Sequence, residues 1–190
     1  MTSDKLFIAA NNYKGKKDIK FSVVRYGNVM GSRGSVIPFF IKQKEKGSLP
    51  ITDKRMTRFN ITLKEGVDFV INCLSVMWGG EIFVPKIPSY KILDVAKAID
   101  SNAKLIFTGI RPGEKLHEEM ITSDDALNTI EFKNYYVILP STPLWDIEDF
   151  MFNSVLEKGS KCKFGFSYNS RTNKDFLSVN DLKQLIKKLV

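Results

Sequence analysis

The sequence predicts an α/β fold: the second half of a doubly wound parallel sheet with a small mixed α/β lobe. Strand-like runs alternate with amphipathic segments, an order typical of parallel strands joined by crossover helices. The strands are few and widely spaced, although parallel strands need neighbours because both their faces are buried. We therefore expect residues 1–130 to combine part of a sheet with the lobe, and residues 131–190 to extend the lobe.

The first third of the chain predicts helix, strand and helix. Residues 3–13 place apolar side chains at helical spacing and precede Gly15, which ends the helix. Residues 19–25 are apolar and β-branched and form the first predicted strand. A helix is predicted over residues 36–46. Pro38 lies in its first turn, where a missing N–H group costs nothing.

The middle of the chain predicts two short strands within residues 49–60 and a helix that starts after Thr62. Thr62 and Glu65 have the spacing of a capping box. The apolar residues of this helix fall on one face, which is expected to pack against the core: Val67, Val70, Ile71, Leu74 and Met77. Residues 81–84 are predicted to form a strand that stops at Pro85.

The last part of the chain repeats the alternation. Helices are predicted at residues 92–99 and 146–157, and a final helix starts at Ser178. Strands are predicted at residues 104–108 and 135–139.

The length and composition describe a globular domain. A chain of 190 residues with 43% hydrophobic and 26% charged residues can bury a core. The longest apolar stretch is too short to span a membrane. Cys73 and Cys162 lack the spacing of a metal site and fit a reducing cytoplasm.

The net charge of +8 requires an acidic partner, either nucleic acid or a small phosphorylated substrate. The lysines are scattered, and no aromatic residues interleave them as in proteins that bind single-stranded nucleic acid. We therefore expect no nucleic-acid partner, and interpret most lysines as a solvated surface.

Three loops contain arginine or asparagine near glycine or proline, namely residues 25–38, 56–60 and 109–115. Arg58 and Arg111 could clamp a diphosphate, because guanidinium groups form bidentate hydrogen bonds with phosphate. Asn28 could donate to the same group, and Glu114 could accept from ribose hydroxyls. The alternative is that Arg-Pro-Gly-Glu forms an exposed turn, which its proline and glycine favour.

His117 lies beside two glutamates and could act as a base or a metal ligand. It is the only histidine of the chain, so a structural role is the favoured interpretation.

The motifs, taken in order, resemble the extended short-chain dehydrogenase/reductase family of nucleotide-sugar enzymes, which have a Rossmann-like domain. Within it they are similar to the inverting UDP-N-acetylglucosamine 4,6-dehydratases, which start pseudaminic acid synthesis. The resemblance extends along essentially the whole chain and rests on these segments: residues 3–7, 21–38, 51–53, 56–59, 111–115, 117–118 and 166–170, with Asn173, Leu177 and Ser178.

The resemblance implies roles for ten residues. Tyr26 would lie near the nicotinamide ring of NADP. The others would contact a UDP-sugar: Asn28, Arg58 and Arg111 at the diphosphate, Glu114 at the ribose, Val36, Ile37 and Pro38 along the nucleotide, and Ile51 and Thr52 beside the uracil.

Members of this family have an N-terminal Gly-x-x-Gly-x-x-Gly loop for NADP and a Tyr-x-x-x-Lys pair shortly before the segment that matches residues 3–7. Met1 and Thr2 directly precede that segment here, so the resemblance implies the substrate-binding C-terminal part alone, inactive by itself. The whole enzyme would oxidise C4 of the sugar, eliminate water across C5 and C6, and return the hydride to C6. The alternatives are a non-catalytic UDP-sugar-binding subunit and part of a related epimerase.

The strand at residues 19–25 would have an open edge without the preceding strands, and open edges tend to associate. We therefore expect a homo-oligomer or an association with a separate N-terminal half.

Overall fold

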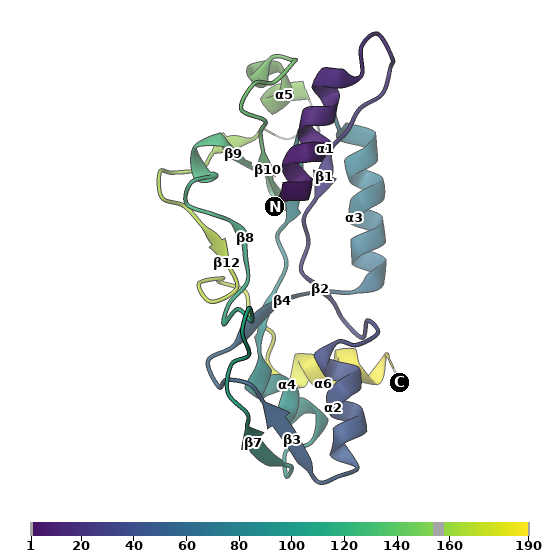
Figure 1. Ribbon diagram of the computed structural model, residues 1–190, viewed down its shortest axis with the longest axis vertical. Coiled ribbons are helices and arrows are strands. Elements are labelled where there is room, and N and C mark those ends of the chain that lie inside the picture. Colours follow the sequence, from purple (N-terminus) through teal and green to yellow (C-terminus); the bar gives the residue numbers. More distant parts are fainter. Residues whose placement is uncertain (1, 154–157, 190) are drawn as a thin grey trace. The chain divides into compact units, whose positions relative to one another are not determined.

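Short strands alternate with helices in the computed structural model, which describes residues 2–153 and 158–189 (Figure 1). The chain divides into two compact units. Unit 1 consists of residues 1–26, 64–86 and 120–168, and unit 2 consists of residues 27–63, 87–119 and 169–190. The predicted α/β class is confirmed, and three pairs of strands are parallel within the described residues. The predicted division between residues 130 and 131 stays a prediction.

Unit 1 contains a five-stranded sheet in the order β1-β5-β10-β9-β11. Its strands are β1 (Val23–Val24), β5 (Ile82–Pro85), β9 (Thr129–Glu131), β10 (Tyr135–Ile138) and β11 (Ser160–Lys161). β1 is parallel to β5 and lies at an edge of the sheet, while β10 is antiparallel to both β5 and β9.

β1 is shorter than the predicted strand at residues 19–25. The backbone of Phe21 is hydrogen-bonded to the side chain of Asn11, and its carbonyl also accepts from the Gly80 N–H at 2.7 Å, ahead of β5. The Asn11 amide accepts from the Phe21 N–H at 3.0 Å and donates to the Phe21 carbonyl at 2.8 Å. The Phe21 N–H is thus bonded to a side chain, which competes with strand pairing, and β1 starts at Val23.

The helices of unit 1 are α1 (Thr2–Tyr13), α3 (Leu63–Val76) and α5 (Ile147–Asn153), with a short 3₁₀ turn, η1 (Ala126–Asn128). Residues 154–157 of the last predicted helix lie outside the described residues. The core combines strand and helix residues, among them Phe83, Phe132, Val137 and Phe150. Within the described part of the chain, no helix is both long and apolar enough to cross a membrane.

The predicted core face of α3 is wrong in part. Val67, Ile71 and Leu74 are 48%, 59% and 64% exposed. The helix instead turns Cys73 and Phe69 towards the core of unit 1. Both faces of this helix carry apolar residues, so helical periodicity alone does not decide which one is covered.

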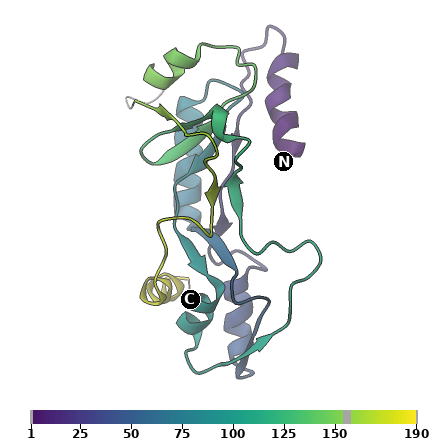
Figure 2. The ribbon, with the colours of Figure 1, turned by 90° about the vertical axis from the view of Figure 1, so that its left-hand side faces the viewer.

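Unit 2 is built from two small sheets and three helices. β2 (Asn28–Val29), β4 (Thr57–Ile61) and β6 (Ser89–Lys91) form one sheet, and β3 (Ser48–Ile51) and β7 (Lys104–Phe107) form the other. The helices are α2 (Val36–Lys44), α4 (Ile92–Ile99) and α6 (Val179–Lys187). Figures 1 and 2 show α6 beside α4, and both helices contribute to the core of this unit. The remaining strands are β8 (Glu119–Ile121) and β12 (Tyr168–Asn169).

A buried carboxylate organises the turn after α3. Glu81 is fully buried and accepts hydrogen bonds from the N–H groups of Trp78 and Gly79. Its second oxygen also accepts from the Ser22 hydroxyl at 2.5 Å. One side chain therefore links the end of α3 to the segment that leads into β1.

We expect Glu81→Gln to lower the free energy of unfolding by about 2–3 kcal/mol, because an NH₂ group would face donors and leave one unsatisfied. Chemical denaturation followed by circular dichroism measures this difference. Glu148→Gln is the matched control, because Glu148 is exposed and its substitution should cost about 0.5 kcal/mol or less. Equal midpoints for the two variants would contradict the role of Glu81.

Candidate functional site

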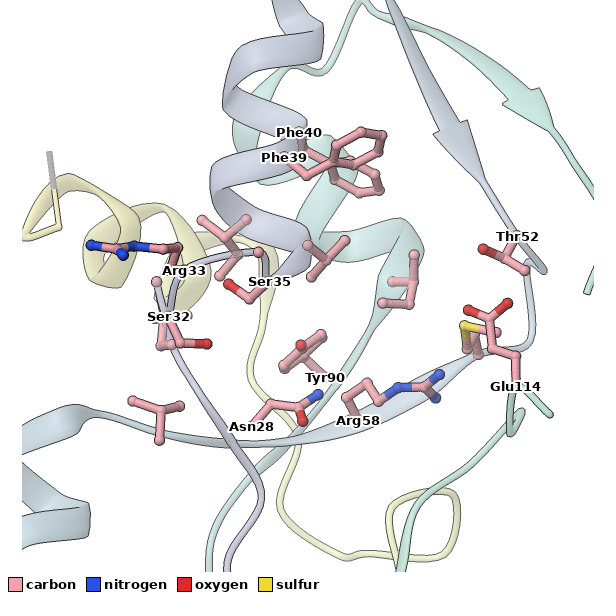
Figure 3. Close-up of a pocket in the computed structure, with 18 of the residues that line it drawn as sticks. Asn28, Ser32, Arg33, Ser35, Phe39, Phe40, Thr52, Arg58, Tyr90 and Glu114 are labelled. Atoms are coloured by element: carbon pink, nitrogen blue, oxygen red, sulfur yellow. The ribbon is translucent and has the colours of Figure 1, made fainter. Parts of the chain in front are cut away.

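Unit 2 encloses a cavity of about 600 Å³ (Figure 3). Pockets that hold ligands of the size of a nucleotide or a drug have volumes of about 300–1,000 Å³. The walls come from five parts of the unit: residues 28–35, the start of α2, the end of β3 with the residues after it, β4 with β6, and the loop at residues 111–114.

Seven of the ten predicted site residues line this cavity: Asn28, Val36, Ile37, Thr52, Arg58, Arg111 and Glu114. Pro38 lies in the first turn of α2 and Ile51 is fully buried in the core, and neither lines the cavity. Tyr26 belongs to unit 1 and is 42% exposed. The structure thus brings most of the predicted residues together, while their contacts with a ligand stay predictions.

The start of α2 forms one wall and is open towards a ligand. Ser35 is its N-cap, but its side chain makes no capping hydrogen bond. The Ser35 hydroxyl oxygen is buried without a hydrogen-bond partner among the described residues, and Figure 3 shows this side chain at the cavity. The first N–H groups of a helix have no partner within the helix, and the helix dipole favours an anion there. This wall is therefore suited to a polar or anionic group.

Arg58 lies in the middle of the cavity wall and is held by backbone carbonyls. Its Nη1 donates to the carbonyls of Thr57 at 2.7 Å and Leu116 at 3.0 Å, and its Nη2 donates to the carbonyl of Lys115 at 2.8 Å. Its side chain is only 14% exposed. The guanidinium group therefore brings a fixed positive charge to the cavity and ties β4 to residues 115–116.

Tyr90 lines the cavity beside Arg58, because the antiparallel strands β4 and β6 pair these two residues and turn their side chains to the same face. It is 2% exposed, and burial raises the pKa of its hydroxyl to about 12. Asn28 hydrogen-bonds to this hydroxyl. Asn28, Arg58 and Tyr90 lie together in Figure 3.

The two ends of the cavity differ in the charge of their side chains. Arg33 and Ser32 lie at one end in Figure 3, and Thr52 and Glu114 lie at the other. Glu114 also accepts a hydrogen bond from the Arg111 backbone N–H at 3.3 Å, which closes the turn that contains both residues.

The excess of positive charge lies in unit 2. This unit contains more lysines and arginines than acids, whereas the two kinds of residue balance in unit 1. Unit 2 also holds the cavity with its three arginines, Arg33, Arg58 and Arg111. The net charge of +8 therefore favours an anionic ligand at this site.

Sequence reasoning missed Tyr90 and several apolar wall residues, namely Met56, Phe39, Phe40 and Ile92. Tyr90 becomes a wall residue only through the pairing of β6 with β4, and no local motif marks that pairing. The phenylalanines of α2 could have been found from their helical neighbours Val36 and Ile37.

His117 takes part in a hydrogen-bond chain outside the cavity wall. Its Nδ1 lies 2.8 Å from the Thr57 hydroxyl, which lies 2.8 Å from the hydroxyl of Ser170. Ser170 is fully buried and accepts from the Glu118 N–H at 2.9 Å. The favoured structural role of His117 fits this geometry. In the described part of the chain, no three His, Cys, Asp or Glu side chains gather as metal ligands would.

We expect the pKa of His117 to lie below 6.5, because partial burial and the nearby charges of Arg171, Arg58 and Arg55 disfavour the imidazolium. The unfolded chain then binds this proton more readily, so stability contributed by His117 is present above about pH 6.5 and decreases as the pH falls below it. The chain has one histidine, so a single imidazole resonance reports the titration by NMR. His117→Asn should show a weaker loss of stability over the same pH range. A pKa above 6.5 would contradict this environment.

The sequence is similar to a known protein family and to enzymes named for nucleotide-sugar substrates. Residues 1–140 match the family described as polysaccharide biosynthesis protein. The UDP-N-acetylglucosamine 4,6-dehydratase (inverting) of Campylobacter jejuni subsp. jejuni serotype O:23/36 is 56% identical over 189 residues, which are 98% of this chain and 57% of that relative. The UDP-glucose 4-epimerase of Rickettsia bellii is 41% identical over 140 residues, which are 71% of this chain and 41% of that relative.

A solved structure shares the fold. The X-ray structure of Pen from Bacillus thuringiensis has a TM-score of 0.83 and 31% sequence identity, and the match covers 100% of this chain and 57% of that one. The chain thus spans little more than half the length of the dehydratase and of this structure.

These matches confirm the resemblance inferred from the motifs, and the matched family covers most of the sequence. The chain belongs to the polysaccharide biosynthesis protein family.

Proposed function

We propose that this chain forms the nucleotide-sugar-binding part of a 4,6-dehydratase that acts on UDP-N-acetylglucosamine. The observation that carries the proposal is the unit 2 cavity, in which Asn28, Arg58 and Arg111 converge from three separate segments. The similarity to a dehydratase over 98% of the chain supports the choice of substrate.

The diphosphate is proposed to lie between the arginines and the start of α2. Arg58 uses three of its N–H groups on carbonyls, which leaves one N–H of its Nη2 for the ligand. Arg111 is exposed at the rim and is free to adapt to a phosphate oxygen. Charge-assisted hydrogen bonds of this kind are stronger than neutral ones, so these groups would supply most of the binding energy for the diphosphate.

The nucleoside is proposed to occupy the remaining walls. Glu114 would accept from the ribose hydroxyls, and Thr52 would lie beside the uracil, since both line one end of the cavity. Val36 and Ile37 supply an apolar wall at the start of α2. Pro38 and Ile51 would act indirectly, by shaping that helix turn and the core behind the wall.

The cofactor is proposed to be NADP, and this chain would contribute Tyr26 near its nicotinamide ring. The 190 residues contain no Gly-x-x-Gly-x-x-Gly loop. The spacing Tyr-x-x-x-Lys occurs at Tyr13 and Lys17, which corrects the expectation that it is absent. However, α1 ends at Tyr13, whose side chain is 87% exposed, so the two residues do not form a pair on one helix face. We therefore propose that these 190 residues alone have no dehydratase activity.

The setting is proposed to be surface-glycan or pseudaminic acid synthesis in the cytoplasm. Cys73 and Cys162 are both free, as a reducing compartment would keep them. We further propose that unit 1 associates with another copy or with a separate N-terminal half. The edge position of β1 and the exposed apolar residues of α3 support this association.

A related epimerase is the second candidate, because a UDP-glucose 4-epimerase matches 71% of the chain. The dehydratase is favoured because its match continues through the tail to 98% of the chain. Binding separates the two: the dehydratase proposal expects UDP-N-acetylglucosamine to bind at least as tightly as UDP-glucose in parallel calorimetric titrations. A clear preference for UDP-glucose would favour the epimerase.

We expect UDP to bind more tightly than uridine, and Arg111→Ala to weaken UDP binding about tenfold, since a hydrogen bond to a charged group contributes about 1.5–3 kcal/mol. Uridine binding should change little. Isothermal titration calorimetry measures both. Arg171→Ala is the control, because it removes the same charge from an exposed residue of unit 2 that does not line the cavity. The proposed site would be wrong if both variants lost the same affinity or if UDP and uridine bound equally.

A further inference from the structure

Glu118 contacts the cavity walls without lining the cavity. Its Oε2 accepts a hydrogen bond from the Phe59 N–H at 2.9 Å, and its Oε1 lies 3.7 Å from Nε of Arg58. It also forms a hydrogen bond with the side chain of Asn28. One carboxylate thus contacts β2 and β4, the two strands that carry Asn28 and Arg58 to the cavity.

The backbone of Glu118 is itself fixed. Its N–H donates to the buried Ser170 hydroxyl at 2.9 Å, and its carbonyl accepts from the Ser170 N–H at 2.8 Å. The Ser170 hydroxyl is also bonded to that of Thr57, the residue before Arg58. The carboxylate therefore extends from a rigid base, and its position is set independently of any ligand.

The contacts of Glu118 complete those that hold Arg58. Three carbonyls fix the two Nη atoms of the guanidinium group, and the carboxylate lies at its Nε edge. The amide of Asn28 is flexible by itself, and its hydrogen bonds to Glu118 and Tyr90 define which way it turns. Without the carboxylate, Asn28 would lose one of these two partners, and Arg58 would lose the ion pair at its Nε edge.

We propose that Glu118 is a positioning residue for the nucleotide diphosphate, acting through Asn28 and Arg58. This inference rests on the proposed function of the same cavity. The proposal predicts the direction in which ligand affinity changes when Glu118 loses its charge. A carboxylate near an anion repels it, so simple electrostatics expects binding to tighten when Glu118 loses its charge. Positioning expects binding to weaken.

The groups around Glu118 shift its pKa in both directions, and the net shift is upward because burial outweighs the others. Arg58 and Lys115 are the nearby cations, and Tyr90 is the further titratable group around it. Burial raises the pKa of Glu118, while the hydrogen bond from Phe59 and the charge of Arg58 act in the opposite direction. Because its pKa is raised, the carboxylate is protonated at a higher pH than an exposed glutamate, and its contacts with Arg58 and Asn28 weaken as it is protonated.

The decisive comparison is Glu118→Gln against Glu119→Gln, titrated calorimetrically with UDP-N-acetylglucosamine. The two changes remove the same charge from adjacent residues, and Glu119 is exposed and does not line the cavity. We expect Glu118→Gln to weaken binding about tenfold and Glu119→Gln to leave it within about twofold, as loss of a charge-assisted contact implies. Unchanged or tighter binding by Glu118→Gln, with the variant folded in a thermal melt, would overturn the proposal.

A double-mutant cycle separates positioning from a general structural effect. If Glu118 acts partly through Asn28, then Asn28→Ala combined with Glu118→Gln should bind less weakly than the sum of the two single losses predicts. Fully additive losses would show that Glu118 does not act through Asn28, and would overturn that part of the proposal.

Hydrogen exchange tests the inference even if the chain binds no UDP-sugar, an outcome that would refute the proposed function instead. Glu118→Ala removes the acceptor of the Phe59 N–H, so this amide should exchange at least tenfold faster, while Glu119→Ala should not change it. Amides of the unit 1 sheet serve as the internal reference. Unchanged protection of Phe59 would show that Glu118 does not hold β4, and the positioning role would be rejected.

Discussion

The candidate site depends on the pairing of β4 with its two neighbours. β2 runs parallel to β4 on one side and β6 runs antiparallel on the other, which brings Asn28, Arg58 and Tyr90 to one cavity. The residue before β2, Gly27, lies unusually close to β4: a Cβ atom at Gly27 would be 2.5 Å from Cβ of Phe59. Glycine is therefore required at this point, and the residue that follows it is the first polar group of the site.

Backbone carbonyls and the Glu118 carboxylate hold the guanidinium group of Arg58, which the pairing of β4 places at the cavity. Arg58 is ordered by three carbonyls and by Glu118, so its orientation costs no further ordering when a ligand enters. Arg111, by contrast, is exposed on a loop and would be ordered by the ligand itself. Unit 2 thus combines one preorganised cation with one adaptable cation, an arrangement suited to a diphosphate.

Local chemistry predicted a large part of the site, and long-range pairing accounts for most of what it missed. Asn28, Arg58 and Arg111 stand in segments that the sequence marks as polar, so their residue types indicated an anion site, although Asn28 and Arg58 lie in the short strands β2 and β4. Tyr90 and Glu118 gained their places from strand pairing and from the hydrogen bonds of Ser170, which no local pattern encodes.

The fold also divides into features that local sequence predicts and features that long-range contacts decide. Helices at residues 2–13, 36–44 and 92–99 were predictable from periodicity, because each has one apolar face and a clear end. The covered face of α3 was not, since Phe69 and Cys73 compete with Val67 and Ile71 for the core. The first strand was predicted too long: the Phe21 N–H donates to the Asn11 side chain, a long-range contact that no local pattern marks.

The most direct test of the account is an NMR titration of the isotope-labelled chain with UDP-N-acetylglucosamine. The account predicts saturable shifts concentrated in unit 2, at the amides of residues 28–37, 56–58, 111 and 113–114 and at Thr52. Shifts confined to unit 1, or shifts that do not saturate, would contradict the claim that the unit 2 cavity binds the nucleotide sugar.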